Sequence, residues 1–242
     1  MLVLAIDTTS EHGGVALYRD RECLASVPNT GTSAFSITLF QMVDRALAEA
    51  GAMLSGQSLN LRDIELFAAA NGPGSFTGIR TGLAAVQGWA TALQRPVAGV
   101  SIPAAMVQEV QPETESAAAI MDARRGEFYL GLFRRDPSVA PHAFQAEGEG
   151  MVVAPEAILK ILDEQLHSGA TLTGILREND AAAQAVLPSL PGSLIWKAVP
   201  EFLVGSIARL ALEAHRSGKT QLPAQLDALY IRRSDAELNW RF

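Results

Sequence analysis

Cysteine is nearly absent from this chain of 242 residues, in which Cys23 is the only one. A single cysteine excludes an internal disulfide and a cysteine-rich zinc site, and it fits a reducing compartment. Basic residues are also few, because 19 Lys and Arg stand against 26 Asp and Glu and give a net charge of -7. Independent binding to a nucleic-acid backbone relies on Lys and Arg that displace counterions. A partner would therefore have to supply that basic surface.

The chain also has little that would place it in a membrane or around a metal. The apolar run at residues 2–6 is too short to span a bilayer, and no basic start or small-residue cleavage site marks a signal peptide. We expect no membrane association and a cytoplasmic location. The four histidines form neither HxxxH nor HExxH, so no metal ligands are predicted. They are His12, His142, His167 and His215.

Two strand–turn–strand patterns organise the chain. Residues 2–6 end at Asp7, and a strand pattern resumes after Gly13 and Gly14. Residues 117–121 end at Asp122, and a second strand covers 127–133. Two related lobes are the simplest account of this repeat. The alternative is that two buried hairpins of an α/β protein look alike without being related.

Two amphipathic helices are predicted between these hairpins. The first covers 33–50 and ends at Gly51, and one face of it is apolar, with Phe40 widening the apolar arc and Ile37 outside it. The second follows a predicted strand at 64–70 and a glycine-rich loop, and it ends near Leu93. Later elements are a strand at 97–100 with Ser101 as a helix N-cap, a loop or irregular strand at 137–150, helices at 155–167 and 200–215, a strand at 170–175 and a docked tail at 226–233. This alternation predicts a largely parallel central sheet with crossover helices.

Small residues spread over one side of the second helix. They are Gly78, Thr81, Gly82, Ala85, Gly88 and Ala92, next to an apolar face of Ile79, Leu83, Val86, Ala90 and Leu93. Glycine inside an exposed helix costs about 0.8–1 kcal/mol relative to alanine, so Gly82 and Gly88 should have a packing reason. Another chain or the protein's own sheet could provide it.

The glycine-rich loop itself permits two interpretations. Gly72, Gly74 and Gly78 lie between a strand and a helix, where backbone N–H groups and the helix N-terminus can hold a phosphate, with Asp7 beside a hydrated metal. The loop lacks the Gly-Lys-Ser/Thr ending of a Walker A motif. Alternatively, the glycines permit tight turns and close packing, and Asp7 caps a turn.

The segment Asn-Gly-Pro-Gly-Ser-Phe-Thr-Gly-Ile-Arg-Thr-Gly at 71–82 resembles the hallmark of the bacterial TsaB family, also called YeaZ. The resemblance extends through Leu-Ala-Ile-Asp-Thr-Thr at 4–9, Met-Asp-Ala-Arg-Arg at 121–125 and Ala-Leu-Tyr-Ile-Arg at 228–232. It implies an α/β duplicated actin-like ATPase (ribonuclease H-like) fold, with two lobes that each have a central mixed sheet and flanking helices. We expect an N-terminal lobe at 1–102 that carries the partner-binding helices. A C-terminal lobe would cover 103–242, with its tail packing back on the first.

The resemblance also implies a function. Members support the N6-threonylcarbamoyladenosine modification at position 37 of tRNAs that read ANN codons. This chain would be the non-catalytic platform subunit, which pairs with the transferase TsaD and with the ATPase TsaE and meets tRNA only through the complex. We expect a homodimer when the partner is absent. No tightly bound cofactor is expected, although ATP or ADP with Mg²⁺ could bind at the interface of the assembled complex.

Family pairing through a helix bundle carries over to a predicted partner interface on both helices. Its residues are Phe35, Leu39, Phe40, Met42, Val43, Ile79, Thr81, Gly82, Leu83, Ala85, Val86 and Trp89. A vestigial phosphate loop would comprise Asp7, Thr8, Thr9, Gly72, Gly74 and Ser75, and no catalytic residue is predicted.

Two departures from related sequences bear on these predictions. Thr8 stands where actin-like ATPases place a glycine, which weakens the case for hydrolysis by the isolated chain, and Phe35 stands where relatives often have histidine. The alternative function is an autonomous ATPase or kinase that uses Asp7 and the loop from Gly72 to Gly78. A metalloprotease would need metal ligands that the sequence does not supply in any recognisable motif.

Overall fold

A computed structural model describes residues 1–30, 34–54, 56, 58–138, 143–167, 171–186 and 194–231 of the chain. The predicted start of the first helix at Ser33, His142 and the end of the predicted tail lie outside these residues. Contacts divide the chain into two units, Met1–Ala105 with Glu201–Leu229, and Met106–Pro200 with Tyr230–Phe242.

Unit 1 contains a five-stranded mixed sheet in the order β3-β2-β1-β4-β5. Its strands are β1 (Leu2–Asp7), β2 (Gly14–Arg19), β3 (Glu22–Pro28), β4 (Leu66–Gly72) and β5 (Val97–Ser101). The first three form an antiparallel meander, and β4 and β5 add to β1 in parallel. The first predicted hairpin is therefore confirmed. Because β1 and β4 are parallel neighbours, their carboxyl ends meet at one edge of the sheet.

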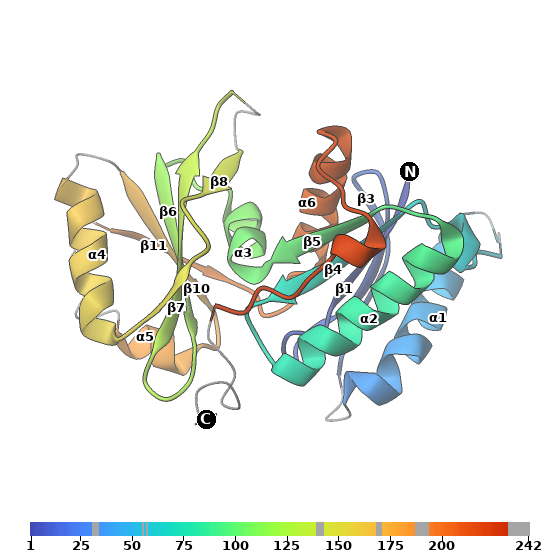
Figure 1. The fold of residues 1–242 in the computed structure, drawn as a ribbon, viewed down its shortest axis with the longest axis horizontal. Helices are drawn as coiled ribbons and strands as arrows, with labels where there is room; N and C mark the ends of the chain where they lie inside the picture. Colours follow the sequence, from blue (N-terminus) through green and yellow to red (C-terminus); the bar gives the residue numbers. More distant parts are fainter. Residues whose placement is uncertain are drawn as a thin grey trace, which may run out of the picture. The chain divides into compact units, whose positions relative to one another are not determined.

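Helices cover both faces of this sheet (Figure 1). They are α1 (Phe35–Met53), α2 (Phe76–Leu93) and α6 (Val204–Arg216), with short 3-10 turns η1 (Leu61–Asp63) and η3 (Pro223–Gln225). Leu4 and Phe67 belong to the core with α1 and α2, whereas their strand neighbours Val3 and Leu66 are buried outside that core. Since successive side chains of a strand point to opposite faces, the latter lie on the face where α6 packs.

The main apolar face predicted for α1 is confirmed, because seven of its residues are buried: Phe35, Leu39, Met42, Val43, Ala46, Leu47 and Ala50. Phe40, which was predicted to widen that face, is instead 57% exposed. The prediction that Gly51 ends the helix was wrong. Gly51 is buried within α1, which continues to Met53. Its intrinsic helix penalty is outweighed by tertiary packing, which commonly overrides propensity at a single position.

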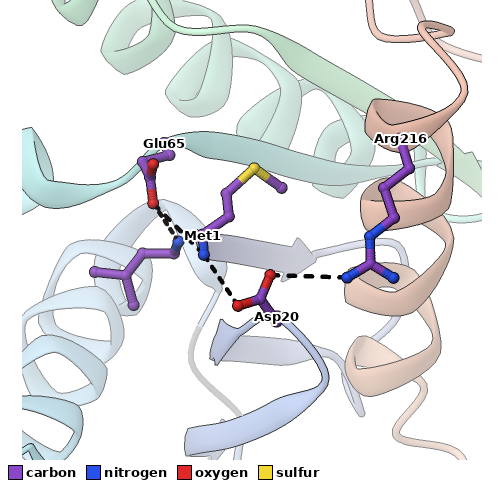
Figure 2. A network of polar contacts seen from close by, with 5 residues as sticks. Met1, Asp20, Glu65 and Arg216 are labelled. Atoms are coloured by element: carbon purple, nitrogen blue, oxygen red, sulfur yellow. Dashed lines mark hydrogen bonds and ion pairs between the residues drawn. The ribbon is translucent and has the colours of Figure 1, made fainter.

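A polar network lies at the end of the unit 1 sheet where β1 and β4 begin (Figure 2). The Met1 amine lies 3.2 Å from an Asp20 carboxylate oxygen and 3.8 Å from Glu65, and Arg216 lies 3.7 Å from the other oxygen of Asp20. The Leu2 N–H also donates to Glu65 at 2.7 Å. The network thereby links the starts of β1 and β4, the β2–β3 turn and the end of α6. Its charged groups are partly exposed, so each pair contributes little to stability.

Unit 2 contains a second mixed sheet, in the order β11-β10-β6-β7-β8, with β9 paired to β7. Its elements are β6 (Ser116–Asp122), β7 (Phe128–Arg135), β8 (Phe144–Ala146), β9 (Met151–Val153), α4 (Pro155–His167), β10 (Leu172–Arg177), α5 (Ala181–Val186) and β11 (Ile195–Val199). The strands β6 and β7 form the second predicted hairpin. Buried Ile120, Leu130, Ile158 and Leu162 build the core between the sheet and α4.

The two sheets have the same topology. The strands β6, β7, β8, β10 and β11 occur in the same chain order and sheet order as β1, β2, β3, β4 and β5. Helices fall at equivalent points of the chain, so that α4, α5 and α6 correspond to α1, α2 and α3 (Ile102–Val110). This repeat resolves the alternative left open by the sequence in favour of duplication.

The units differ from the expected lobes at 1–102 and 103–242. The first stretch of unit 1 ends at Ala105, and Glu201–Leu229 also belongs to unit 1. The reason is the helix α6, whose buried face, including Val204, Ile207 and Ala211, packs on the unit 1 sheet. The segment after α6 stays with unit 1 because buried Leu226 joins its core.

Candidate functional site

The predicted phosphate loop meets the glycine-rich segment at the carboxyl ends of β1 and β4. Asp7 is buried, and its Oδ1 accepts hydrogen bonds from the Thr9 N–H at 2.8 Å and the Thr9 hydroxyl at 2.7 Å. The Thr8 hydroxyl donates to the Gly78 carbonyl at 2.7 Å, and the Ser75 N–H donates to the Thr9 carbonyl at 2.7 Å. The loop is thus tied directly to the start of α2.

The glycines of this segment make room for that loop. A β-carbon at Gly74 would lie 2.5 Å from the Thr9 carbonyl oxygen, and one at Gly78 would lie 2.0 Å from the Thr8 carbonyl oxygen. At Gly82 it would lie 2.4 Å from the Thr8 hydroxyl. These distances are far below van der Waals contact, so only glycine fits. The packing interpretation of these glycines therefore accounts for them.

Gly72 has a different close neighbour. Its φ of +122° is unfavourable for other residues, and a β-carbon there would lie 2.8 Å from the Leu229 carbonyl oxygen. The Leu229 N–H in turn donates to the Asn71 carbonyl at 2.7 Å. The segment after α6 thereby packs against the end of β4.

The structure brings the residues of the predicted vestigial loop together, but as packed chain. Ser75 caps α2 by accepting a hydrogen bond from the Gly78 N–H at 3.2 Å, which occupies one donor that a phosphate would need. Within unit 1 these residues do not fit a phosphate group, because Thr8 and Thr9 fill the space beside the glycines. This packing gives no support to an autonomous ATPase built on Asp7 and the loop. Among the described residues, no group of three or more His, Cys, Asp and Glu side chains is placed to hold a metal.

The predicted partner interface is divided by the structure. Most of its residues are buried in the core of unit 1 and cannot face a partner: Phe35, Leu39, Met42, Val43, Ile79, Gly82, Leu83 and Val86. Phe40 is exposed, and Thr81, Ala85 and Trp89 are partly exposed. The prediction mixed two sides of each helix because the inward, sheet-facing arc is the more apolar one. It did not identify the side that faces solvent.

Large apolar side chains nevertheless remain exposed on the same two helices. On α1, Ile37 is 68% exposed, Phe40 57% and Met53 57%, and on α2 Phe76 is 44% exposed. The Phe40 ring packs edge-on against Trp89, with centroids 5.7 Å apart, and Arg80 lies 3.9 Å above the Phe76 ring. Ile37 and Phe76 were missed as interface candidates. For Ile37, its position outside the inward apolar arc was the sequence signal.

The outward side of α2 is lined by small residues. Thr77, Ala84, Gly88, Thr91 and Ala92 are exposed along it. At Gly88 a β-carbon would meet no atom within 4 Å, in contrast to Gly74, Gly78 and Gly82. Nothing in the described chain therefore explains a glycine at this position of the helix. We call the exposed sides of α1 and α2, with Ile37, Phe40, Phe76 and this small-residue strip, the α1–α2 surface.

A groove continues this surface toward the C-terminal ends of both helices. It has a volume of about 600 Å³ and is lined by Asp44, Leu47 and Ala48 of α1, by Trp89, Ala92 and Leu93 of α2, and by residues 58–62.

The flank of α2 away from α1 is closed by the segment after α6, because the Gln87 side-chain amide donates to the Leu226 carbonyl at 2.8 Å and the Pro223 carbonyl at 3.2 Å.

In unit 2, Asp122 ends β6 as Asp7 ends β1. Its Oδ1 accepts from the Arg124 N–H at 2.6 Å, and its own N–H donates to Asp180 at 2.8 Å. Burial, and next the Asp122 charge, raise the pKa of Tyr129 above 10.0. Asp122 thus caps the turn that follows β6.

Two sheets with one shared topology and matching helices define the class, a duplicated actin-like fold. A family model for TsaD, described as tRNA N6-adenosine threonylcarbamoyltransferase, matches residues 25–161, more than half of the chain. The chain belongs to this TsaD-like family and, within it, to the TsaB (YeaZ) group.

Individual relatives agree with this assignment. The chain is 28% identical to the tRNA threonylcarbamoyladenosine biosynthesis protein TsaB of Escherichia coli, over 98% of this chain and 96% of that protein. It is 33% identical to the tRNA N6-adenosine threonylcarbamoyltransferase of Thermus thermophilus over 40% of this chain and 32% of that protein. The solved structure of YeaZ from Pseudomonas aeruginosa aligns with a TM-score of 0.70 at 26% identity, over 94% of this chain and 98% of that one. No helix in the described ranges has the length and apolarity to cross a bilayer.

Proposed function

We propose that this chain is the non-catalytic platform subunit of the assembly that makes N6-threonylcarbamoyladenosine at position 37 of tRNAs that read ANN codons. It pairs with a TsaD-like transferase through the α1–α2 surface, and a TsaE-like ATPase joins the pair. Support for the pathway comes from the full-length similarity to a TsaB protein named for this biosynthesis. A net charge of -7 supports contact with tRNA only through the complex.

The observation that carries the pairing is Gly88. A glycine inside an exposed helix costs about 1 kcal/mol relative to alanine, yet no atom lies within 4 Å of the β-carbon position. The neighbouring exposed residues Ala84, Thr91 and Ala92 are also small, which lets the backbone of another helix approach closely. Exposed Phe40 and Phe76 flank this strip with apolar area. A helical partner surface would bury both features at once.

The TsaD family model matches a stretch of this chain that includes both helices, which supports a homologous lobe as the partner. Because a surface that binds a homologous lobe can also bind a second copy of itself, we expect the α1–α2 surface to pair two copies of this chain when the transferase is absent. For nucleotides, we propose that the isolated chain binds none tightly. ATP or ADP with Mg²⁺ then binds only at the interface of the assembled complex.

Light scattering on mixtures with the transferase of the same organism tests the proposal. We expect a stable complex for the natural chain and a loss of at least about tenfold in affinity, or about 1.4 kcal/mol, for Ala84→Trp and Gly88→Trp. Ala182→Trp is the matched control, because Ala182 is an exposed helical alanine of α5 in unit 2. Absence of a complex with and without nucleotide would contradict the proposal.

Calorimetry with Mg-ATP tests the catalytic alternative. We expect no tight binding by the isolated chain. Binding and turnover that Asp7→Ala abolishes would instead favour the autonomous ATPase.

A further inference from the structure

Basic side chains collect at the edge of the unit 1 sheet where its parallel strands begin. Four segments meet there, residues 19–22, 60–65, 95–96 and 215–221, and we call them the amino edge. Six of the nine Lys and Arg of unit 1 belong to these segments, against four of its eleven Asp and Glu. The amino edge therefore has a net charge of +2, in a chain whose net charge is -7. The six are Arg19, Arg21, Arg62, Arg95, Arg216 and Lys219.

Backbone pairing and hydrogen bonds place these segments next to one another. Arg19 pairs with Leu2 at the start of β1, and the Arg95 guanidinium donates to the Arg62 carbonyl at 3.4 Å. The chain just after Lys219 forms a bridge with the start of β5. Because neighbouring strands lie about 4.8 Å apart, the row of segments from β3 to β5 extends over about 20 Å.

Most carboxylates of the amino edge are neutralised within unit 1. Figure 2 shows Asp20 and Glu65 on either side of the Met1 amine, with Arg216 also directed at Asp20. Asp63 accepts a backbone N–H at 2.8 Å in the cap of η1. These acids are therefore largely unavailable to repel an approaching anion.

The other basic side chains of the amino edge have no carboxylate to neutralise them. Within the described residues, no ion pair involves the following five: Arg19, Arg21, Arg62, Arg95 and Lys219. All except Arg95, which is half-buried, are exposed. Glu22 is the one carboxylate of the amino edge that also lacks an ion pair or a side-chain hydrogen bond in the part of the chain described. Five cations thus stand against one carboxylate.

Large apolar side chains are not part of this row. None of the seven that are exposed in the described ranges belongs to the segments of the amino edge, and Leu222 only borders one of them. Stable protein–protein interfaces have an apolar core, whereas proteins hold nucleic acids largely through phosphates, with Arg and Lys as donors. A row of unneutralised cations without an apolar centre therefore favours a nucleic acid over an acidic protein.

We propose that, in the assembled complex, the amino edge holds the phosphate backbone of the tRNA on which the transferase acts. This inference rests on the proposed function and adds a tRNA contact made by this chain itself. A row of about 20 Å spans several phosphates of a nucleic-acid strand, and each guanidinium can hold a phosphate through two parallel N–H···O bonds. The contact supplements binding by the transferase, because the net charge of -7 opposes tight binding of RNA by the isolated chain.

Titration of a fluorescent tRNA that reads ANN codons with the preformed complex of this chain and the transferase tests the proposal. Arg21→Ala and Lys219→Ala each remove one cation from the amino edge. Arg134→Ala and Lys160→Ala are the matched controls, because each removes an exposed cation that is paired with a carboxylate in unit 2. We expect each amino-edge variant to bind the tRNA about three- to tenfold more weakly, and each control to stay within about twofold.

The salt dependence is a second readout, which a purely structural effect would not move. Loss of one phosphate contact lowers the slope of log affinity against log salt concentration by about 0.7–0.9, and we expect this change in Arg21→Ala and Lys219→Ala alone. Both residues are exposed and form no ion pair in the described chain, so the variants should fold. Thermal unfolding and light scattering check that each variant is folded and bound to the transferase.

The outcomes separate this inference from the proposed function. Unchanged tRNA affinity and salt slope in the amino-edge variants would overturn the inference while the platform function stands. An equal loss in the controls would also overturn it, because net charge alone would then explain the effect. If the amino-edge variants weaken only the binding of the ATPase, the partner of this edge is a protein and the inference is wrong. If the natural chain forms no complex with the transferase, the proposed function fails, and the inference fails with it.

Discussion

Replacing Gly78 by alanine should destabilise unit 1, although the same change usually favours a helix. Gly78 lies in the first turn of α2, where an added β-carbon would stand 2.0 Å from the Thr8 carbonyl oxygen. A carbonyl oxygen cannot rotate away as a side chain can. The loop that carries it is also held at Thr9, whose carbonyl accepts from the Ser75 N–H at 2.7 Å. The backbone of the loop or of α2 must therefore move.

The expected size follows from three contributions. Overpacking costs about 1–3 kcal/mol, and loss of the Thr8–Gly78 hydrogen bond, which is 2.7 Å long in the natural chain, adds about 1 kcal/mol. Alanine returns about 1 kcal/mol of helix propensity. The net loss is about 2 kcal/mol. At Gly88, which faces open space on the same helix, alanine adds only helix propensity. Gly88→Ala should therefore raise the free energy of unfolding by up to about 1 kcal/mol.

Urea unfolding followed by circular dichroism measures both variants against the natural chain. The pair isolates packing from propensity, because both substitutions make the same chemical change within α2. We expect the midpoints to move in opposite directions, with a difference of about 3 kcal/mol between the variants. Equal midpoints for the two variants would refute the close-packing role of Gly78.

Three further predictions concern local contacts. Ser75→Ala removes the hydrogen bond accepted from the Gly78 N–H and should cost about 1 kcal/mol in the same assay, whereas no loss would show that the cap is dispensable. Asp20→Asn should cost at most about 1 kcal/mol, with the effect shrinking in high salt, and a large salt-independent loss would contradict a partly exposed network. Burial and the Asp122 charge raise the pKa of Tyr129 above 10.0 in the folded chain. The stabilisation of the folded chain that results from this shift is complete below about pH 10, and it is lost as pH rises through the folded pKa. Stability should thus fall less steeply above pH 10 in Tyr129→Phe, as urea midpoints across that range would show, and identical slopes would argue against the shift.

The family and the inward faces of the main helices could be read from the sequence. Periodicity at 3.6 residues predicted the arc that includes Leu39, Val43 and Ala46, because burial against a sheet selects apolar residues at that spacing. The hallmark segment at 71–82 identified the TsaB group, and the repeated hairpins were consistent with duplication. These features depend on residues that are close together in the chain.

The tertiary structure alone decided what each small residue does. Gly82 and Gly88 are both glycines within the same helix, and the sequence does not distinguish their roles. In the structure, Gly82 faces the Thr8 hydroxyl and Gly88 faces open space. Likewise α6 joins unit 1, although it follows the strands of unit 2 in the chain. Which neighbour a residue meets depends on the packing of segments far apart in sequence, and local periodicity contains no information about that packing.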